Sequence, residues 1–255
     1  MWIGSCRWSM PKKRSRHADS ISTTLTITEI PKCMKSEKII IFGSSGHARS
    51  IAEILEKLDY EIVGFIDSYL PKGQKVLNYK TIGNEENLIN SEKLFGTNNV
   101  AIGVGDIKGR NKVVEKIRSL NASVKFPTII SPDATISKYS KIGEGTVVFN
   151  NSFINVECVI GKFCIINSAS IVEHNTQICD YCTISPAVNI GGDVKIEEFS
   201  FIGSSATIIQ KRTIGKHVVI GAGAVVTRNI PDNVLAVGIP AIVKKDNYKN
   251  DKLLK

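Results

Sequence analysis

Residues 160–190 read IGKFCIINSASIVEHNTQICDYCTISPAVNI, and this stretch carries the pattern that decides the fold. Counting in steps of six from Ile130 to Val226, all 17 positions are Ile or Val. The residue four places after most of them is small, as at Ser152 and Cys164. A six-residue repeat of this kind is typical of β-helices, because the branched side chain fills a stacked core and the small one leaves room at a corner. The period fits neither an amphipathic α-helix nor an alternating strand.

The rest of the composition is that of an ordinary soluble protein, with 42% hydrophobic and 22% charged residues among 255. Residues 1–35 hold seven Lys or Arg against two acidic residues, which accounts for +5 of the net charge of +9. We interpret residues 1–35 as a disordered basic extension and expect no nucleic-acid partner. The native chain could instead begin at Met34, just before the first predicted strand. No apolar run approaches the roughly 18 residues that a membrane span needs.

The placement of the six cysteines does not resemble a disulfide framework. Cys158, Cys164 and Cys182 hold the small inward position of the repeat, as expected of packing residues in a reduced, cytoplasmic protein. Cys179 and Cys182 have the spacing of a metal-binding pair, but no second pair follows, so we expect no metal.

An α/β domain precedes the repeats. We predict strands over residues 38–43, 61–66 and 100–104 and helices over residues 48–58 and 110–120. The glycine-containing turn at residues 43–47 joins the first strand to the first helix, an arrangement that lets a helix N-terminus face a phosphate. Asp67 ends the next strand about 20 residues later, where an acid suits ribose or base hydroxyls.

Four motifs in this order resemble one family. They are G-x-S-G-H at residues 43–47, I-V-E-H at 171–174, G-A-G-A-V-V-T at 221–227 and G-I-P-A at 238–241. Together they resemble the bacterial sugar acyltransferases related to sialic-acid O-acetyltransferases and to the N-acetyltransferases of UDP-4-amino-sugars. The resemblance covers about residues 37–245.

The resemblance implies a Rossmann-like α/β N-terminal domain followed by a left-handed parallel β-helix of hexapeptide repeats, with three hexads in each triangular coil. It also implies a homotrimer, with active sites between subunits and acetyl-CoA as co-substrate. We accordingly divide the chain into residues 1–35, a sugar-nucleotide-binding domain at 36–127, an acyltransferase domain at 128–245 and a tail at 246–255.

The site residues are carried over by position. His174 matches the general base of the family, flanked by Glu173 and Asn175. The predicted sugar-nucleotide contacts are Ser45, Gly46, His47, Asp67, Ser68 and Gly103. The predicted acetyl-CoA contacts are Thr183, Gly192, Ser204 and Ala222.

Two departures from the family pattern concern the base. Asn175 stands where an Asp or Glu usually orients the imidazole, and an amide carries no charge to stabilise the imidazolium. Glu173 could substitute, although neighbouring strand residues point to opposite faces. Thr183 stands where many relatives have a second His, and its hydroxyl can still donate one hydrogen bond.

The preferred function is transfer of an acetyl group from acetyl-CoA to the amine of a nucleotide-linked 4-amino-sugar. The alternatives are an O-acetyltransferase acting on a sialic-acid-like sugar and a scaffold that binds sugar nucleotides without turnover. A zinc β-helix of the carbonic anhydrase type needs three histidines, but the coils hold only His174 and His217. A nicotinamide enzyme is disfavoured because the first domain is short for a full dinucleotide fold.

Overall fold

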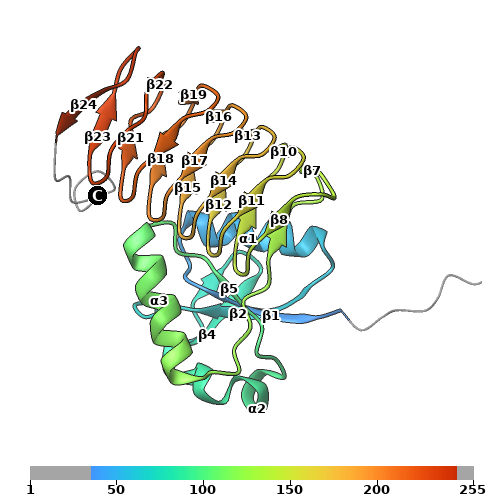
Figure 1. Cartoon of the computed structure of the whole chain (residues 1–255). Helices are drawn as coiled ribbons and strands as arrows, with labels where there is room; N and C mark the ends of the chain where they lie inside the picture. Colours follow the sequence, from blue (N-terminus) through green and yellow to red (C-terminus); the bar gives the residue numbers. More distant parts are fainter. Residues whose placement is uncertain (1–35, 246–255) are drawn as a thin grey trace, which may run out of the picture. The chain divides into compact units, whose positions relative to one another are not determined.

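The structure is a computed structural model that describes residues 36–245 (Figure 1). A five-stranded sheet of order β3-β4-β2-β1-β5 comes first, and only β3 runs antiparallel to its neighbour. The elements of this part are β1 (Lys38–Phe42), α1 (Gly46–Lys57), β2 (Glu61–Ile66), β3 (Lys75–Val76), β4 (Tyr79–Gly83), the 3-10 helix η1 (Glu85–Asn90), α2 (Ser91–Phe95), β5 (Val100–Ile102) and α3 (Ile107–Leu120). No helix within residues 36–245 is long and apolar enough to cross a membrane.

The predicted strands and helices of this domain are present, with small shifts at their ends. The second predicted helix begins three residues early, at Ile107, because the Asp106 carboxylate accepts a hydrogen bond from the Gly109 backbone at 2.6 Å and caps it. Strands β3 and β4 and helix α2 were not predicted, since the segments are short and lack a clear apolar period.

The β-helix follows as a left-handed parallel coil. Its strands are β6 (Ile129–Ile130), β7 (Thr135–Ile136), β8 (Lys141–Ile142), β9 (Val147–Val148), β10 (Phe153–Ile154), β11 (Val159–Ile160), β12 (Ile165–Ile166), β13 (Ile171–Val172), β14 (Gln177–Ile178), β15 (Thr183–Ile184), β16 (Asn189–Ile190), β17 (Lys195–Ile196), β18 (Phe201–Ile202), β19 (Thr207–Ile208), β20 (Thr213–Ile214), β21 (Val219–Ile220), β22 (Val225–Val226), β23 (Leu235–Val237) and β24 (Ile242–Lys245). From β6 to β22, strands that lie three hexads apart pair in parallel, as Phe153 pairs with Ile171, and this is the predicted coil length. At the end of the coil β23 pairs in parallel with β21, and β24 pairs with β23 in the antiparallel direction.

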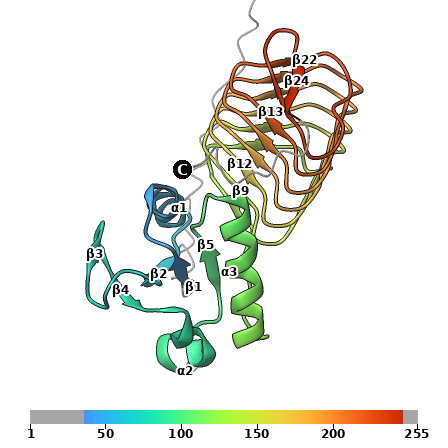
Figure 2. The ribbon, with the colours of Figure 1, turned by 90° about the vertical axis from the view of Figure 1, so that its left-hand side faces the viewer.

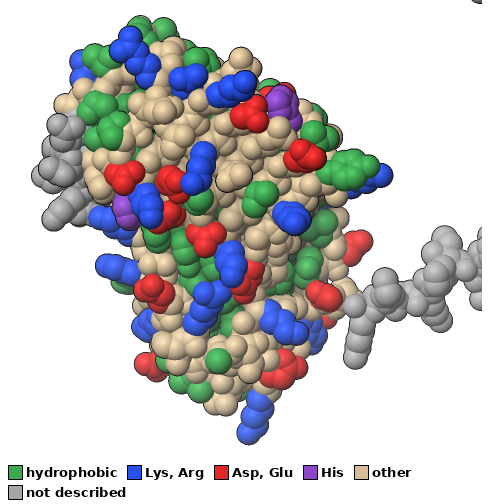
Figure 3. All heavy atoms as spheres, viewed as in Figure 1, with side chains coloured by type: hydrophobic (Ala, Val, Ile, Leu, Met, Phe, Trp, Pro, Cys, Tyr) green, Lys and Arg blue, Asp and Glu red, His purple; other side chains and the backbone are tan. Residues whose placement is uncertain are grey.

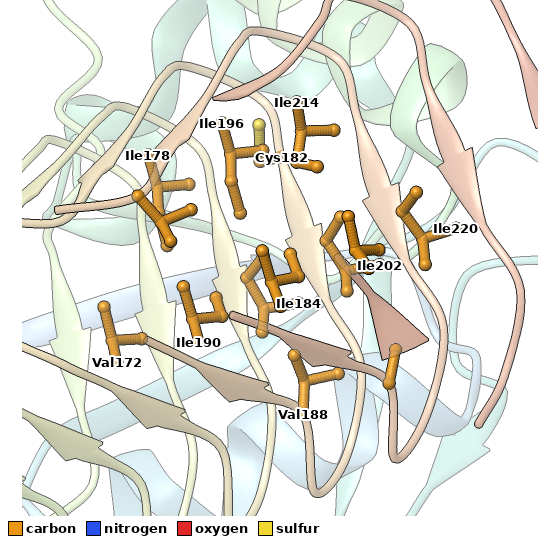
Figure 4. Packing of buried hydrophobic residues seen from close by; sticks show 14 of the residues in the cluster. Val172, Ile178, Cys182, Ile184, Val188, Ile190, Ile196, Ile202, Ile214 and Ile220 are labelled. Atoms are coloured by element: carbon orange, nitrogen blue, oxygen red, sulfur yellow. The ribbon is translucent and has the colours of Figure 1, made fainter. Parts of the chain in front are cut away.

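Three sheets form the sides of the coil. Face 1 contains β6, β9, β12, β15, β18, β21, β23 and β24; face 2 contains β7, β10, β13, β16, β19 and β22; face 3 contains β8, β11, β14, β17 and β20. We name the turns between them corner 1–2, corner 2–3 and corner 3–1, in chain order. The second residue of each two-residue strand points inward, so that Ile184, Ile202 and Ile220 stack along the axis (Figure 4).

The corners from Gly145 to Gly223 share one backbone conformation. At each sixth residue from Gly145 to Gly223, φ is positive, between 53° and 68°. Twelve of these positions are not glycine, although the left-handed region is unfavourable for residues with a Cβ. The stacked core and the ladder hydrogen bonds of neighbouring coils therefore hold each corner against a local backbone preference.

Aromatic rings stack along corner 3–1. Phe163, Tyr181, Phe199 and His217 hold equivalent left-handed positions in successive coils, and neighbouring ring centroids lie 5.1–5.2 Å apart. The spacing is close to that of neighbouring strands, so the rings add contact area at the interval that the coils impose.

The α/β domain packs against face 1 at the end of the coil that contains β9 and β12 (Figure 2). Helix α1 lies beside β6. The outward residues of the first coils on this face, Ile129, Val147 and Ile165, are each no more than 3% exposed. His47 lies at the same boundary, where its ring centroid is 5.5 Å from that of Phe149 on corner 1–2. The first coils of face 1 are thus an interior surface of the described chain, whereas faces 2 and 3 carry exposed side chains.

Glu157 is an exposed residue on corner 2–3 with φ of 58°. This left-handed backbone predicts that replacing Glu157 with Val or with Gly will change the stability of the protein by different amounts. Gly tolerates this conformation and Val does not, because Val adds a branched Cβ. We expect the Glu157→Val protein to be less stable than Glu157→Gly by about 1–2 kcal/mol. Chemical denaturation of both variants measures the difference, and equal stabilities would contradict a left-handed corner at this position.

His47 predicts a pH dependence of stability. Burial, and then the positive charge of Arg110, lower the pKa of His47 from 6.5 to about 4. Between these two pH values the unfolded chain binds a proton that the folded chain does not, so the contribution is present above pH 6.5 and is lost as pH falls toward 4. We expect a loss of about 2–3 kcal/mol from this group. His47→Gln should flatten the unfolding free energy across that window, and an unchanged pH profile would show that the imidazole is not held neutral.

Candidate functional site

The turn between β1 and α1 presents a helix N-terminus. Gly43 has φ of 94°, and a Cβ there would lie 3.1 Å from the Gly103 carbonyl oxygen, so the turn needs a glycine. Ser45 occupies the N-cap position of α1 in an extended conformation, and its side chain makes no capping hydrogen bond. Ser45 and Gly46 are both exposed. The first N–H groups of a 12-residue helix therefore face outward beside a hydroxyl, which is a suitable arrangement for an anion.

Gly103 lies behind this turn rather than on its outer surface. It is buried, and a Cβ at this position would come within 2.4 Å of the Ala48 Cβ and 2.8 Å of the Phe42 carbonyl oxygen. Its N–H donates to the Phe42 carbonyl at 2.7 Å, and its own carbonyl accepts a bond from the Ser45 hydroxyl at 3.4 Å. Gly103 thus lets the end of β5 support the turn closely.

Asp67 connects the turn to the next strand end. Its carboxylate accepts hydrogen bonds from the Ser44 hydroxyl at 2.5 Å and from the backbone N–H groups of Tyr69 and Leu70 at 2.8 and 3.1 Å. Ser44 was not singled out from the sequence, although it stands inside the glycine turn. Asp67 therefore fixes the conformation of the glycine-containing turn through Ser44, and it also lies at the edge of that turn.

A pocket opens next to Asp67, with a volume of about 390 Å³. Its lining is Asp67, Ser68, Tyr69, Leu70, Pro71, Lys72, Gly83, Asn84 and Asn87. The Ser68 hydroxyl donates to Glu85 at 2.8 Å, and Tyr69 is 95% exposed. An exposed aromatic ring beside amide and hydroxyl groups offers both a stacking surface and hydrogen bonds to a planar polar ligand.

The His47 side chain turns toward the β-helix. Its Nε2 atom is buried and has no hydrogen-bond partner among the described residues, and its Cβ and Cγ lie beside Gly105. Within the turn, it is therefore the backbone of His47, rather than its ring, that belongs to the exposed helix N-terminus.

His174 lies on corner 2–3, between β13 and β14, and is exposed. Its ring lies over Gly192, the equivalent residue of the next coil. A Cβ added to Gly192 would come within 2.5 Å of His174 Cε1 and 2.7 Å of Nε2. The structure thus brings together one predicted catalytic residue and one predicted acetyl-CoA contact, because they are one full coil apart on the same corner.

The residues that flank His174 bond to neighbouring coils. Glu173 accepts a hydrogen bond from the Asn155 side chain at 2.6 Å, and the Asn175 amide donates to Asp193 at 3.2 Å. Both side chains are therefore directed to the equivalent corner of another coil rather than to the imidazole. Asp193 was not singled out from the sequence, and its place one coil beyond Asn175 follows from the spacing of three hexads.

The other predicted acetyl-CoA contacts lie elsewhere on the coil. Ser204 and Ala222 are equivalent residues of neighbouring coils on corner 1–2. Thr183 lies on face 1, is 7% exposed and accepts a hydrogen bond from Arg110 at 3.0 Å. Within one protomer, these three residues therefore lie apart from His174 and Gly192. The Thr183 hydroxyl is already hydrogen-bonded to the α/β domain.

Cys179 and Cys182 do not point the same way. Cys182 is fully buried in the core, whereas Cys179 is partly exposed and lies with Glu197 and Glu198, their ligand atoms all within 4.8 Å of one another. The two carboxylates pair with Lys195 and Lys216, each at 2.7 Å. Burial, and then the nearby Glu197, raise the pKa of the Cys179 thiol to about 11. A protonated thiol beside paired carboxylates is a poor ligand set for zinc.

A shallow groove of about 540 Å³ lies beside this cluster, on face 3 and corner 3–1. Its lining includes Cys179, Tyr181, Glu198 and Phe199.

Basic and acidic side chains are interspersed over the molecular face in Figure 3. Exposed ion pairs of this kind contribute little stability individually.

Comparisons with known proteins agree with both halves of this architecture. Residues 38–117 match the family model of the PglD N-terminal domain, and residues 193–228 match that of the bacterial transferase hexapeptide repeats. GDP-perosamine N-acetyltransferase of Escherichia coli O157:H7 is 33% identical over 190 residues, which cover 72% of this chain and 82% of that protein. The bifunctional protein GlmU of Psychrobacter is 33% identical over 112 residues, 44% of this chain but only 22% of that longer protein.

Solved structures are similar over most of the described residues. A variant of GDP-perosamine N-acetyltransferase from Caulobacter crescentus, in complex with CoA and GDP-perosamine, has a TM-score of 0.78 at 31% identity and covers 82% of this chain and 97% of its own. The acetyltransferase domain of PglB from Neisseria gonorrhoeae, in complex with acetyl coenzyme A, has a TM-score of 0.74 at 31% identity and covers 82% and 100%. The chain therefore belongs to the hexapeptide-repeat sugar acyltransferases, the acetyltransferase family that its motifs predicted.

Proposed function

We propose that this protein transfers the acetyl group of acetyl-CoA to the amine of a nucleotide-linked 4-amino-sugar. The observation that carries the proposal is the similarity, over 82% of the chain, to an N-acetyltransferase bound to both CoA and GDP-perosamine. The exposed anion-binding turn at α1 and the exposed imidazole of His174 provide, in this chain, the two kinds of group that such a transfer requires.

In the proposed reaction His174 acts as general base. The sugar amine attacks the thioester carbonyl, and the imidazole takes the proton that the nitrogen gives up as the C–N bond forms. The C–S bond then breaks, and the proton can pass to the departing CoA thiolate. Both substrates react in one ternary complex, so positioning supplies much of the rate.

The surroundings of His174 favour nitrogen over oxygen as the acceptor atom. Glu173 and Asn175 both bond to other coils, so the Glu173 carboxylate is not free to support the imidazole. An amine needs less help from a base than a sugar hydroxyl does, because it is already a good nucleophile when neutral. A weakly supported imidazole therefore suits N-acetylation better than O-acetylation.

The positions of the two half-sites support a shared site between copies of the chain. The α/β domain covers face 1, and its turn at residues 43–47 lies near corner 1–2 through the His47–Phe149 contact. His174 lies on corner 2–3, so the turn and His174 lie near the two different edges of face 2. A complete site would then combine the corner 2–3 of one protomer with the corner 1–2 and the α/β domain of a neighbour.

Face 2 is the surface that we propose joins the copies. Its outward row contains no charged side chain; the row is Thr135, Phe153, Ile171, Asn189, Thr207 and Val225. The outward row of face 3 includes Lys141 and Lys195, both exposed. Three copies arranged with face 2 toward a threefold axis place the corner 2–3 of each beside the corner 1–2 of the next. A homotrimer would therefore complete three equivalent sites.

The catalytic proposal predicts the effect of two substitutions on corner 2–3. His174→Ala removes the base and should lower kcat by about 10²–10⁴-fold. Gly192→Ala adds a methyl group where the imidazole lies, so it should displace the ring and lower kcat by roughly tenfold or more. Release of the CoA thiol measures turnover of acetyl-CoA with GDP-perosamine and with a UDP-linked 4-amino-sugar.

His217→Ala is the matched control for these variants, because it removes the other histidine of the coils from corner 3–1. This control should keep wild-type turnover. Full activity of His174→Ala would remove His174 from the mechanism. Binding of both ligands by the wild-type protein without turnover would favour the scaffold alternative.

The assembly proposal predicts the effect of a charge on face 2. Ile171 is 38% exposed, and Ile171→Arg would bury a charge between copies at a cost of several kcal/mol. We expect the wild-type protein to sediment as a trimer, at three times the chain mass of 27.9 kDa, and Ile171→Arg to sediment as the monomer. Val159→Arg places the same charge on face 3 and should leave the trimer intact. A monomeric wild type would contradict the shared site.

A further inference from the structure

Arg110, on the first turn of α3, is only 1% exposed. By volume it ranks first among the fully buried side chains of the described residues. Its guanidinium makes five hydrogen bonds, one for each N–H group. The acceptors are the carbonyl oxygens of Val104, Gly105, Phe163 and Tyr181 and the hydroxyl of Thr183, at distances of 2.7–3.2 Å. The fork of donors is therefore fully occupied.

These acceptors belong to two separate parts of the molecule. Val104 and Gly105 lie in the loop after β5, in the α/β domain, whereas Phe163, Tyr181 and Thr183 belong to two successive coils of the β-helix. Arg110 is thus bonded at the same time to the loop and to the coils. Its planar fork fixes the relative position of the five acceptors more strictly than a flexible cation would.

No acceptor of Arg110 carries a charge. Burial lowers the pKa of Arg110 to about 10, so the guanidinium remains protonated at neutral pH. A buried charge without a carboxylate partner is costly, and an apolar side chain would fill the same space with less desolvation. A role in packing alone therefore does not account for an arginine at this position.

The loop that Arg110 holds supports the predicted sugar-nucleotide turn from behind. Gly103 bonds to Phe42 and to the Ser45 hydroxyl, and the Gly43 backbone approaches its carbonyl oxygen closely. Gly105 lies against the His47 side chain. A displacement of the loop by a few tenths of an ångström would therefore move the turn at the N-terminus of α1.

We propose that Arg110 is a positioning residue that holds the loop at residues 103–105, and through it the sugar-nucleotide turn, in register with the β-helix. The inference rests on the proposed function, because the position of the turn affects activity only if the turn binds the sugar nucleotide. It moves Thr183 from the acetyl-CoA side of the site, where the sequence suggested it, to the sugar-nucleotide side. Thr183 supplies the one side-chain acceptor of the fork.

Thr183→Val tests this assignment with the least disturbance of the core. It keeps the branched shape and removes the hydroxyl, which leaves one buried N–H group of Arg110 without a partner. With GDP-perosamine and acetyl-CoA as substrates, we expect the KM for GDP-perosamine to rise about three- to tenfold. The kcat and the KM for acetyl-CoA should stay at their wild-type values. Thr183→Ser, which restores the acceptor, should recover the wild-type KM.

The same kinetic experiment can overturn the proposal. A rise in the KM for acetyl-CoA would return Thr183 to the acetyl-CoA side. Unchanged KM values for both substrates would show that the contact does not set the position of the turn. A fall in kcat alone, in proportion to a loss of folded protein, would reduce the contact to a structural one.

Hydrogen exchange provides a readout that does not depend on turnover. In Arg110→Lys the charge is kept, but an ammonium has three donors and no planar fork. We expect the backbone amides of residues 103–106 to exchange about threefold faster or more, in this variant and in Thr183→Val, while the amides of β18 and β21 keep their wild-type rates. Equal acceleration throughout the chain, or none in the loop, would contradict the proposal.

The kinetic and hydrogen-exchange measurements together distinguish failure of the inference from failure of the proposed function. If the wild-type protein turns over neither GDP-perosamine nor a UDP-linked 4-amino-sugar, the proposed function fails. Exchange in Thr183→Val then decides whether Arg110 holds the loop. If Arg110→Lys does not fold, Thr183→Val still supplies both the kinetic and the exchange measurements.

Discussion

The structure depends on the stacking of one branched side chain on another, once in every coil along each face. Parallel pairing across the three faces fixes the distance between coils, and the inward Ile and Val side chains fill the space that this distance leaves. The stack is continuous from Val148 to Val226 and nearly all its members are fully buried. Each coil therefore contributes little alone, and cooperation between neighbours holds even the left-handed corners in place.

This constraint leaves most of each hexad free to carry function. The core requires one branched and one small inward residue, so the three residues between them at a corner can vary without loss of packing. His174 and Gly192 occupy such positions, and the interval of three hexads places one directly over the other. Precise placement of a flexible side chain thus comes from the repeat, although the residue itself lies on an exposed corner.

The sequence predicted the parts that depend on local or periodic order. The repeat predicted a β-helix, and the coil length of three hexads that the family resemblance implies is enough to bring His174 beside Gly192 and Ser204 beside Ala222. It could not predict which face the α/β domain covers, because that packing joins Ile39 and Phe65 to Ile129 and Ile165 across long separations in the chain. For the same reason the partner of Thr183 was missed: Arg110 reads as one more polar residue on an amphipathic helix until the tertiary structure buries it. Ser44 was overlooked because its hydrogen bond to Asp67 spans two strand ends.

The three faces of the coil have become chemically different although they share one backbone. The first coils of face 1 are covered by the α/β domain, the outward row of face 2 is uncharged and open, and face 3 carries lysines. A triangular coil with three equivalent faces could pack in several ways, but covering one face and charging another leaves one surface suited to apolar contact. Because the turn of the α/β domain lies near corner 1–2 and His174 lies on corner 2–3, both proposed half-sites border that remaining surface. The same differences that would select a mode of assembly would therefore also bring together the two halves of the site.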